Sequence, residues 1–267
     1  MENLATKITT PNMTFLSEET CHGCQRKIEV YEVEVIGGPN KGDLIEWKKG
    51  CVCEDIQMAE KAKENRAKAI TRKMQEIFES HSLISRDLEK ANFENFEPKN
   101  KQQDYAKRSC MKYVQIFERE NPRNLLLFGN YGLGKSHLAK SVADGLIDKG
   151  FSAIFISVPK LLRKIKSTYS NQSEVSEDEI INHLEQVDLL VLDDLGAEKQ
   201  SDWTIERIFD IIDSRQGMST IYTTNYTLND LRAKIGERNF SRVVNQDTTS
   251  LEFSGKNYRL SNFEGDE

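Results

Sequence analysis

The chain has 267 residues, of which 37% are hydrophobic and 30% charged, with a net charge of −6. This length suits one medium domain with a small one beside it, and the mild acidity excludes a surface that attracts nucleic acid everywhere, so such contacts require a local basic patch. Because no apolar run reaches the length of a signal-peptide core or a membrane span, we expect a soluble, cytoplasmic protein with no membrane partner.

The first predicted element is a β-hairpin. Residues 27–36 alternate between polar and apolar side chains, which is the period of a half-buried strand. The glycine-rich segment 37–42 predicts a turn, and residues 44–47 can return as the second strand.

Paired cysteines flank this hairpin. Cys21 and Cys24 have C-x-x-C spacing, and Cys51 and Cys53 have C-x-C spacing. Four such thiolates can close a tetrahedral Zn²⁺ site, with His22 as an alternative to one of them, whereas reduced structural cysteines or a redox pair remain the other interpretations. Four protein ligands leave no open position, so we expect a structural metal in a zinc-binding domain over residues 1–54.

Residues 55–92 contain neither glycine nor proline, and their apolar residues recur at helical spacing among many charges. This pattern predicts a long amphipathic linker helix. It is consistent with a connector that packs on its neighbour and equally with a docking helix for a partner protein.

From about residue 93 the pattern alternates between helices and short apolar strands, which is typical of a parallel α/β sheet. Ser176 and Glu179 form a capping-box signature for one of these helices. The predicted strands are 124–128, 153–158, 188–192 and 220–224, and the other predicted helices are 105–120, 136–149, 159–167 and 203–215.

Residues 129–136 match the pattern of a phosphate-binding loop and lie where that loop belongs, between an apolar strand and a helix. Glycines let the backbone turn its N–H groups toward a phosphate, and the helix N-terminus adds its dipole. Lys135 would reach the β- and γ-phosphates, and the Ser136 hydroxyl would bind Mg²⁺. The sequence therefore predicts that ATP or ADP binds along Gly129, Asn130, Tyr131, Gly132, Leu133, Gly134, Lys135 and Ser136.

Two acids follow the apolar strand 188–192. In a parallel sheet, ligands bind outside the carboxyl ends of the strands, so these side chains are expected near the phosphate loop. Asp193 would hold Mg²⁺ through water, and Asp194 would orient or deprotonate the attacking water. The polar run Thr223-Thr224-Asn225 ends the next strand and can contact the same water.

These motifs, in this order, resemble the DnaC/DnaI helicase loaders and the related IstB transposition ATPases. The resemblance covers about residues 93–260 and is most specific at the phosphate loop and at Asp193–Glu198. Its further parts are Trp203, Thr224-Asn225-Tyr226, residues 237–242 and residues 255–259.

The resemblance implies an AAA+ core with a five-stranded parallel sheet and no lid domain over residues 93–267. It implies that Asn225 is the sensor-1 residue and that Arg259 is a sensor-2-like arginine beside the nucleotide. Arg242 would be an arginine finger presented to the next subunit, with Arg238 as the second candidate, so self-association is expected through this domain. Surface ion pairing is the other interpretation of these arginines. Asp194 stands where most AAA+ proteins have glutamate, so hydrolysis is expected to be slow.

The resemblance also implies a loader that binds a hexameric DnaB-type replicative helicase through its amino-terminal zinc domain and places it on single-stranded DNA. The basic segment 159–169, which ends in Tyr169, resembles a helix that lines the DNA path, although a solvated basic face gives the same pattern. The alternatives are an IstB-like ATPase that assists a transposase and a nucleotide-dependent binding module that hardly hydrolyses ATP. Cys110 is expected to be an isolated thiol.

Overall fold

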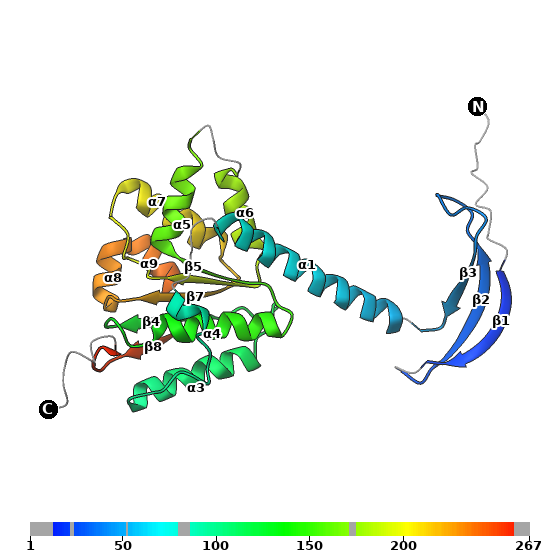
Figure 1. Ribbon diagram of the computed structural model, residues 1–267, viewed down its shortest axis with the longest axis horizontal. Coiled ribbons are helices and arrows are strands. Elements are labelled where there is room, and N and C mark those ends of the chain that lie inside the picture. The colour runs from blue at the N-terminus through cyan, green and yellow to red at the C-terminus, as the bar shows by residue number, and fades with distance from the viewer. Residues whose placement is uncertain (1–12, 22–23, 52, 80–85, 171–174, 259–267) are drawn as a thin grey trace. The chain divides into compact units, whose positions relative to one another are not determined.

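The computed structural model describes residues 13–21, 24–51, 53–79, 86–170 and 175–258 (Figure 1). Contacts divide the chain into two compact units, 1–63 and 64–267. Within the described ranges, no helix combines the length and the low polarity that crossing a bilayer requires.

The first unit contains a three-stranded antiparallel sheet in the order β1-β2-β3. The predicted hairpin is present as β2 (Lys27–Glu34) and β3 (Leu44–Lys49). A third strand, β1 (Met13–Thr20), pairs with β2 and carries a bulge between Phe15 and Ser17. No sequence pattern predicted β1. The bulge shifts its residues out of simple alternation, which removes the period-two signal.

The helix predicted over residues 55–92 is present in part. α1 spans Cys53–Glu79, residues 80–85 lie outside the described ranges, and a single turn, α2 (Arg86–Glu89), follows. The uninterrupted stretch without glycine or proline explains the 27-residue length of α1.

The second unit is built on a five-stranded parallel sheet in the order β5-β6-β7-β4-β8. The strands are β4 (Asn124–Gly129), β5 (Ala153–Ser157), β6 (Leu189–Asp193), β7 (Ser219–Thr224) and β8 (Thr248–Phe253). This confirms the predicted α/β class and the five parallel strands. The strand order brings the carboxyl ends of β6, β7 and β4 side by side, which is where the phosphate loop and the paired acids lie.

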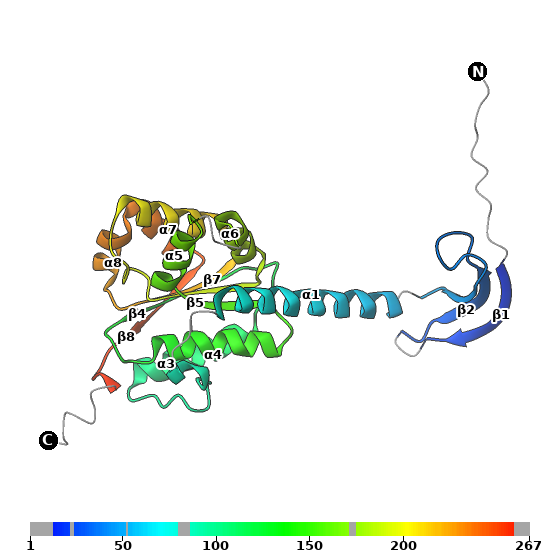
Figure 2. The same cartoon turned by 45° about the horizontal axis from the view of Figure 1, so that its top comes forward.

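Helices cover both faces of this sheet (Figure 2). One face carries α3 (Lys101–Gln115) and α4 (Lys135–Asp148). The helices of the other face are α5 (Val158–Ser167), α6 (Glu177–Gln186), α7 (Asp202–Ser214), α8 (Leu228–Ile235) and α9 (Glu237–Val243).

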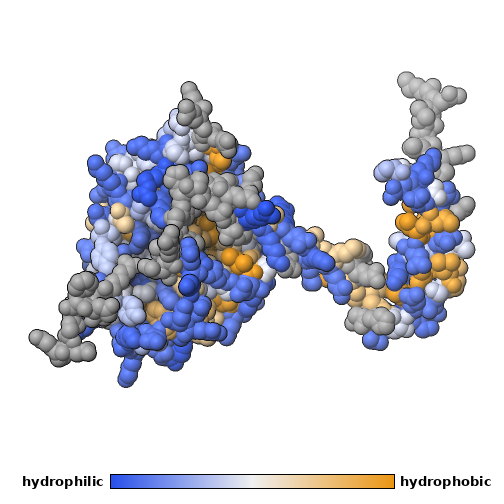
Figure 3. All heavy atoms as spheres, viewed as in Figure 1, coloured by the Kyte–Doolittle hydropathy of each residue, from blue (hydrophilic) through white to orange (hydrophobic). Residues whose placement is uncertain are grey.

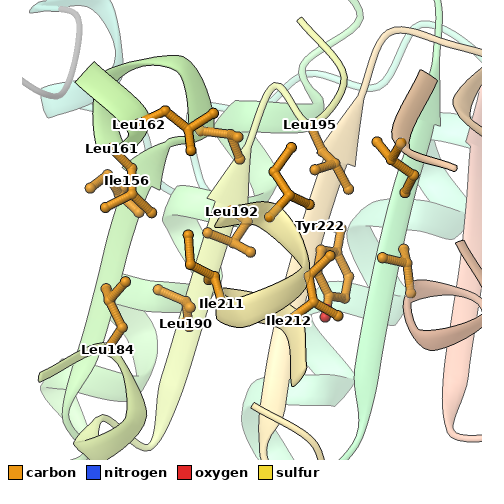
Figure 4. Packing of buried hydrophobic residues seen from close by; sticks show 14 of the residues in the cluster. Ile156, Leu161, Leu162, Leu184, Leu190, Leu192, Leu195, Ile211, Ile212 and Tyr222 are labelled. Carbon is orange, nitrogen blue, oxygen red and sulfur yellow. The ribbon is translucent and has the colours of Figure 1, made fainter. Parts of the chain in front are cut away.

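Alternate strand residues point to opposite faces and build two separate cores. Leu190 and Leu192 of β6 pack with α5 to α9, whereas Leu189 and Val191 pack with α3 and α4. Figure 4 shows the first of these cores, in which Tyr222 packs beside Leu192 and Ile212. Burial on both faces explains why the central strands are continuously apolar in sequence.

Candidate functional site

The phosphate loop follows β4 and turns directly into α4, and its three glycines all have positive φ angles: 127° at Gly129, 69° at Gly132 and 86° at Gly134. A Cβ atom at Gly129 would collide with the backbone of Phe253, and one at Gly134 would collide with the Phe96 ring. Both the backbone angles and the close neighbours therefore require glycine at these positions.

Lys135 begins α4 and is buried. Its ammonium donates hydrogen bonds to the carbonyl oxygens of Gly129 at 2.8 Å and Asn130 at 2.6 Å. These bonds hold the ammonium over the phosphate loop. When a nucleotide binds, phosphate oxygens can replace the two carbonyl oxygens as its hydrogen-bond partners.

The loop forms one side of a cavity of about 610 Å³, within the size range of small-ligand and cofactor sites. The cavity brings together most of the residues predicted for nucleotide chemistry: Tyr131, Gly132, Leu133, Gly134, Lys135, Ser136, Asp193, Asp194 and Asn225. Its remaining lining is Leu88, His137, Phe155, Ser157, Lys160, Ala197 and Tyr258. Arg259 lies outside the described residues.

Asp194 and Asn225 meet at the edge of the sheet. The Asn225 amide donates a hydrogen bond of 2.9 Å to Asp194 Oδ1. Asp194 has a left-handed backbone with φ of 59°, a conformation that is uncommon outside glycine and that turns the chain sharply after β6. The predicted sensor residue and the predicted water-directing acid are therefore in direct contact.

Asp193 is buried between the loop and β7, next to a second acid. Burial and repulsion from Asp194 raise the pKa of Asp193 to about 6, although hydrogen bonds from Ser136 and Thr223 and the charge of Lys135 oppose this rise. A divalent cation would relieve both unfavourable effects, so the donor set of Ser136 and Asp193 fits Mg²⁺.

The two candidate finger arginines lie on α9 and do not line this cavity. The guanidinium carbons of Arg238 and Arg242 lie 3.5 and 4.7 Å from the centre of the Phe209 ring. Arg242 also donates to Asp213 Oδ1 at 2.8 Å. Phe209 and Asp213 of α7 thus hold both arginines beside one another.

The basic segment 159–169 folds as α5 and the turn that follows it. Its apolar side chains enter the core, while Arg163 and Lys166 are exposed. Tyr169 is 54% exposed, and its hydroxyl accepts a hydrogen bond of 3.1 Å from the Trp203 indole. The Lys166 ammonium lies 5.9 Å from the centre of the Trp203 ring. Two aromatic rings and a lysine therefore meet at one exposed place.

The four paired cysteines come together at one end of the small sheet, and their sulfur atoms all lie within 4.8 Å of one another. Hydrogen bonding with the thiols of Cys51 and Cys24 raises the pKa of the Cys53 thiol to about 12. The arrangement is compatible with a four-cysteine zinc site. His22 lies outside the described residues.

The same sheet carries a row of aromatic rings across its three strands. Phe15, Tyr31 and Trp47 are direct cross-strand neighbours, with ring centres 5.7 and 6.2 Å apart. Phe15 is 56% and Trp47 44% exposed. Met13, Val33 and Ile45 form the next row in register, and Figure 3 shows hydrophobic residues gathered on this sheet. An exposed apolar face of this kind is characteristic of a protein interface.

The contacts that three residues make at these sites were not predicted. Thr223 contacts both acids, Phe209 supports both arginines, and the Tyr258 amide donates to the carbonyl of Gly132 at 3.1 Å. Thr223 belongs to the polar run that was expected beside the attacking water, but its bonds to the two acids were not predicted. The other two contacts join segments that the sequence does not link.

A phosphate loop after β4, paired acids at the end of β6 and an asparagine after β7, the strand between them, define an ATP-binding protein of the AAA+ class. The chain belongs to the IstB-like ATP binding proteins, whose family model matches residues 56–262, and within them to the DnaC/DnaI-type helicase loaders. This membership gives the chain a general AAA+ ATPase character. The cysteine cluster precedes the matched residues.

Individual comparisons agree with this family. The chain is 30% identical over 219 residues to the replicative helicase loader DnaC of Escherichia coli strain K12, covering 81% of this chain and 86% of that protein. It is 25% identical over 169 residues to the replicative helicase loader DnaI of Bacillus subtilis strain 168, covering 60% of this chain and 52% of that one. A crystal structure of the DnaC helicase loader matches with a TM-score of 0.58 at 29% identity, covering 64% of this chain and all of that chain.

The raised pKa of Asp193 predicts a pH-dependent stability effect. In metal-free buffer at pH 7.5, Asp193→Asn is expected to raise the free energy of unfolding by about 1–3 kcal/mol, because the buried charge is removed. The folded-state pKa lies above that of the unfolded chain, so wild type regains stability as the pH falls from about 6 toward 4. Urea unfolding at several pH values measures this; equal stabilities at pH 7.5 would contradict it.

The cysteine cluster predicts a metal-dependent small domain. Cys24→Ser or Cys53→Ser is expected to reduce bound zinc from one per chain toward none and to make residues 13–51 sensitive to protease. Cys110→Ser is the matched control, because this thiol is buried in the second unit. Metal analysis and limited proteolysis measure both effects, and a wild-type domain that stays folded after complete zinc removal refutes the interpretation.

Proposed function

We propose that this protein is an ATP-dependent loader that binds a hexameric DnaB-type replicative helicase and helps to place it on single-stranded DNA during replication initiation. The observation that carries the proposal is the nucleotide cavity, with Lys135, Asp194 and Asn225, in a chain 30% identical to a protein named as a replicative helicase loader. Residues 1–54 would be the helicase-interaction domain, 55–92 the linker and 93–267 the ATPase.

Each residue of the cavity has a defined part in this proposal. The amides of the phosphate loop and Lys135 bind the phosphates, and Ser136 with Asp193 holds Mg²⁺, which supplies charge neutralisation at the phosphates. Asp194 orients the attacking water. Asn225 holds Asp194 through the 2.9 Å hydrogen bond. Because Asn225 also lines the cavity, it can contact the same water.

Arg242 acts in a neighbouring subunit, with Arg238 as the second candidate, so assembly completes the site. Both arginines lie on α9 away from their own cavity, which suits action in trans. An arginine finger accelerates phosphoryl transfer by about 10³–10⁵-fold, so the isolated protein hydrolyses slowly. Self-association through the ATPase unit is therefore part of the proposal.

Single-stranded DNA is bound at the cluster of Lys166, Tyr169 and Trp203. Aromatic rings stack on bases without regard to sequence, and a lysine beside them attracts the backbone. The overall charge of −6 makes such a local patch necessary.

The helicase is bound at the aromatic row of the zinc domain. Phe15 and Trp47 are large and exposed, and the half-buried Tyr31 contacts both rings, which suits the aromatic composition of interface hot spots. The zinc ion would keep the ends of the strands together so that the three rings stay in register. An IstB-like ATPase that assists a transposase is the alternative, since the family model carries that name.

One experiment separates these parts. The protein is mixed with the replicative helicase of the same genome, complex formation is measured by light scattering, and delivery by unwinding on single-stranded circles. Trp47→Ser is expected to weaken the complex by about 30-fold, the loss of about 2 kcal/mol typical of a buried hot spot. Trp203→Ala is expected to leave the complex intact and to reduce delivery, because base stacking contributes about 1–3 kcal/mol.

Matched variants control this experiment. Glu46→Ser changes the neighbour of Trp47 on the opposite face of β3 and is expected to bind helicase normally, and Trp203→Phe keeps a stacking ring. Binding to a transposase with no binding to the helicase would contradict the loader and support the alternative.

A further inference from the structure

Thr223 of β7 is the residue through which both paired acids are joined to the sheet. It is 0% exposed. Its hydroxyl donates a hydrogen bond of 2.7 Å to Asp193 Oδ1 and accepts one of 3.0 Å from the backbone amide of Asp194. One oxygen atom therefore fixes the side chain of the first acid and the backbone of the second.

Hydrogen bonds to the surrounding backbone fix the position of this hydroxyl. The Leu195 amide donates to the Thr223 carbonyl at 2.8 Å, and the Thr224 hydroxyl donates to the Leu195 carbonyl at 2.7 Å. The two adjacent threonines thus hold the turn that follows β6 on both sides. These bonds hold Asp194 in its left-handed backbone conformation. Without them, we expect the turn to relax to a more common conformation.

We infer that Thr223 is a positioning residue for the magnesium and water-directing carboxylates, and this inference rests on the proposed ATPase function. Groups that hydrogen-bond a metal-binding carboxylate set its orientation, and their loss typically weakens metal binding or activity by 10–100-fold. The hydroxyl is needed because the position must donate to Asp193 and accept from Asp194 at the same time.

The neighbouring residue offers a matched control. Thr224 is also 0% exposed and lies on the same strand, but its hydroxyl donates to the Leu195 carbonyl and accepts from the Tyr226 amide, so it bonds neither acid. Thr223→Val and Thr224→Val remove the same atom from adjacent buried places. Both are expected to lower stability, because each leaves buried polar groups without a partner.

The test measures the Mg²⁺ dependence of ADP binding by calorimetry, together with the ATP hydrolysis rate and urea unfolding. For Thr223→Val, the Mg²⁺ concentration at half-maximal binding is expected to rise by about tenfold or more, and the hydrolysis rate to fall by a similar factor. Binding of ADP in the presence of a chelator is expected to equal that of wild type. Thr223→Ser, which keeps the hydroxyl, restores both values, and Thr224→Val keeps the wild-type Mg²⁺ dependence.

The outcomes separate this inference from the function on which it rests. Wild type without Mg²⁺-dependent nucleotide binding would overturn the proposed function itself. Wild type with such binding, combined with an unchanged Mg²⁺ dependence in Thr223→Val, would overturn the inference alone. The inference would also be overturned if both valine variants changed the Mg²⁺ dependence equally, or if Thr223→Ser did not restore it. Thr223 would then contribute to stability alone.

Discussion

The turn of the phosphate loop is the constraint on which the rest of the second unit depends. Gly129 and Gly134 have backbone angles that other residues avoid, and their neighbours leave no room for a side chain. This geometry brings the Lys135 ammonium onto the carbonyl oxygens of Gly129 and Asn130, beside the N-terminus of α4. A helix N-terminus with an ammonium beside it favours an anion, and a nucleoside triphosphate supplies one.

Sheet topology then decides which other groups share that volume. Because β7 lies between β4 and β6, its last residues contact the acids that follow β6 while remaining close to the loop that follows β4. Thr223 at the end of β7 therefore bonds the carboxylate of Asp193, and Asn225 just after the strand bonds that of Asp194. The buried Asp193 is costly as a charge, and its raised pKa is the physical mark of a site shaped for a cation.

The sequence predicted the elements whose signal is local. Apolar runs predicted β4, β5, β6 and β7, and the loop pattern with the polar strand ends predicted more than half of the residues that line the cavity. The sequence did not predict strand β8 (Thr248–Phe253), because this edge strand has only two buried residues and most of its residues are polar. The pairing of α7 with the arginines of α9, and the aromatic row across three strands, depend on tertiary packing that no local period encodes.

The central claim is that this cavity holds a nucleoside triphosphate with Mg²⁺, and calorimetric titration of ATP and ADP tests it most directly. The account predicts Mg²⁺-dependent binding by wild type and a loss of at least about tenfold in affinity for Lys135→Ala, because a hydrogen bond to a charged group contributes about 1.5–3 kcal/mol. Wild type that binds neither nucleotide, or Lys135→Ala that binds both as well as wild type does, would contradict it.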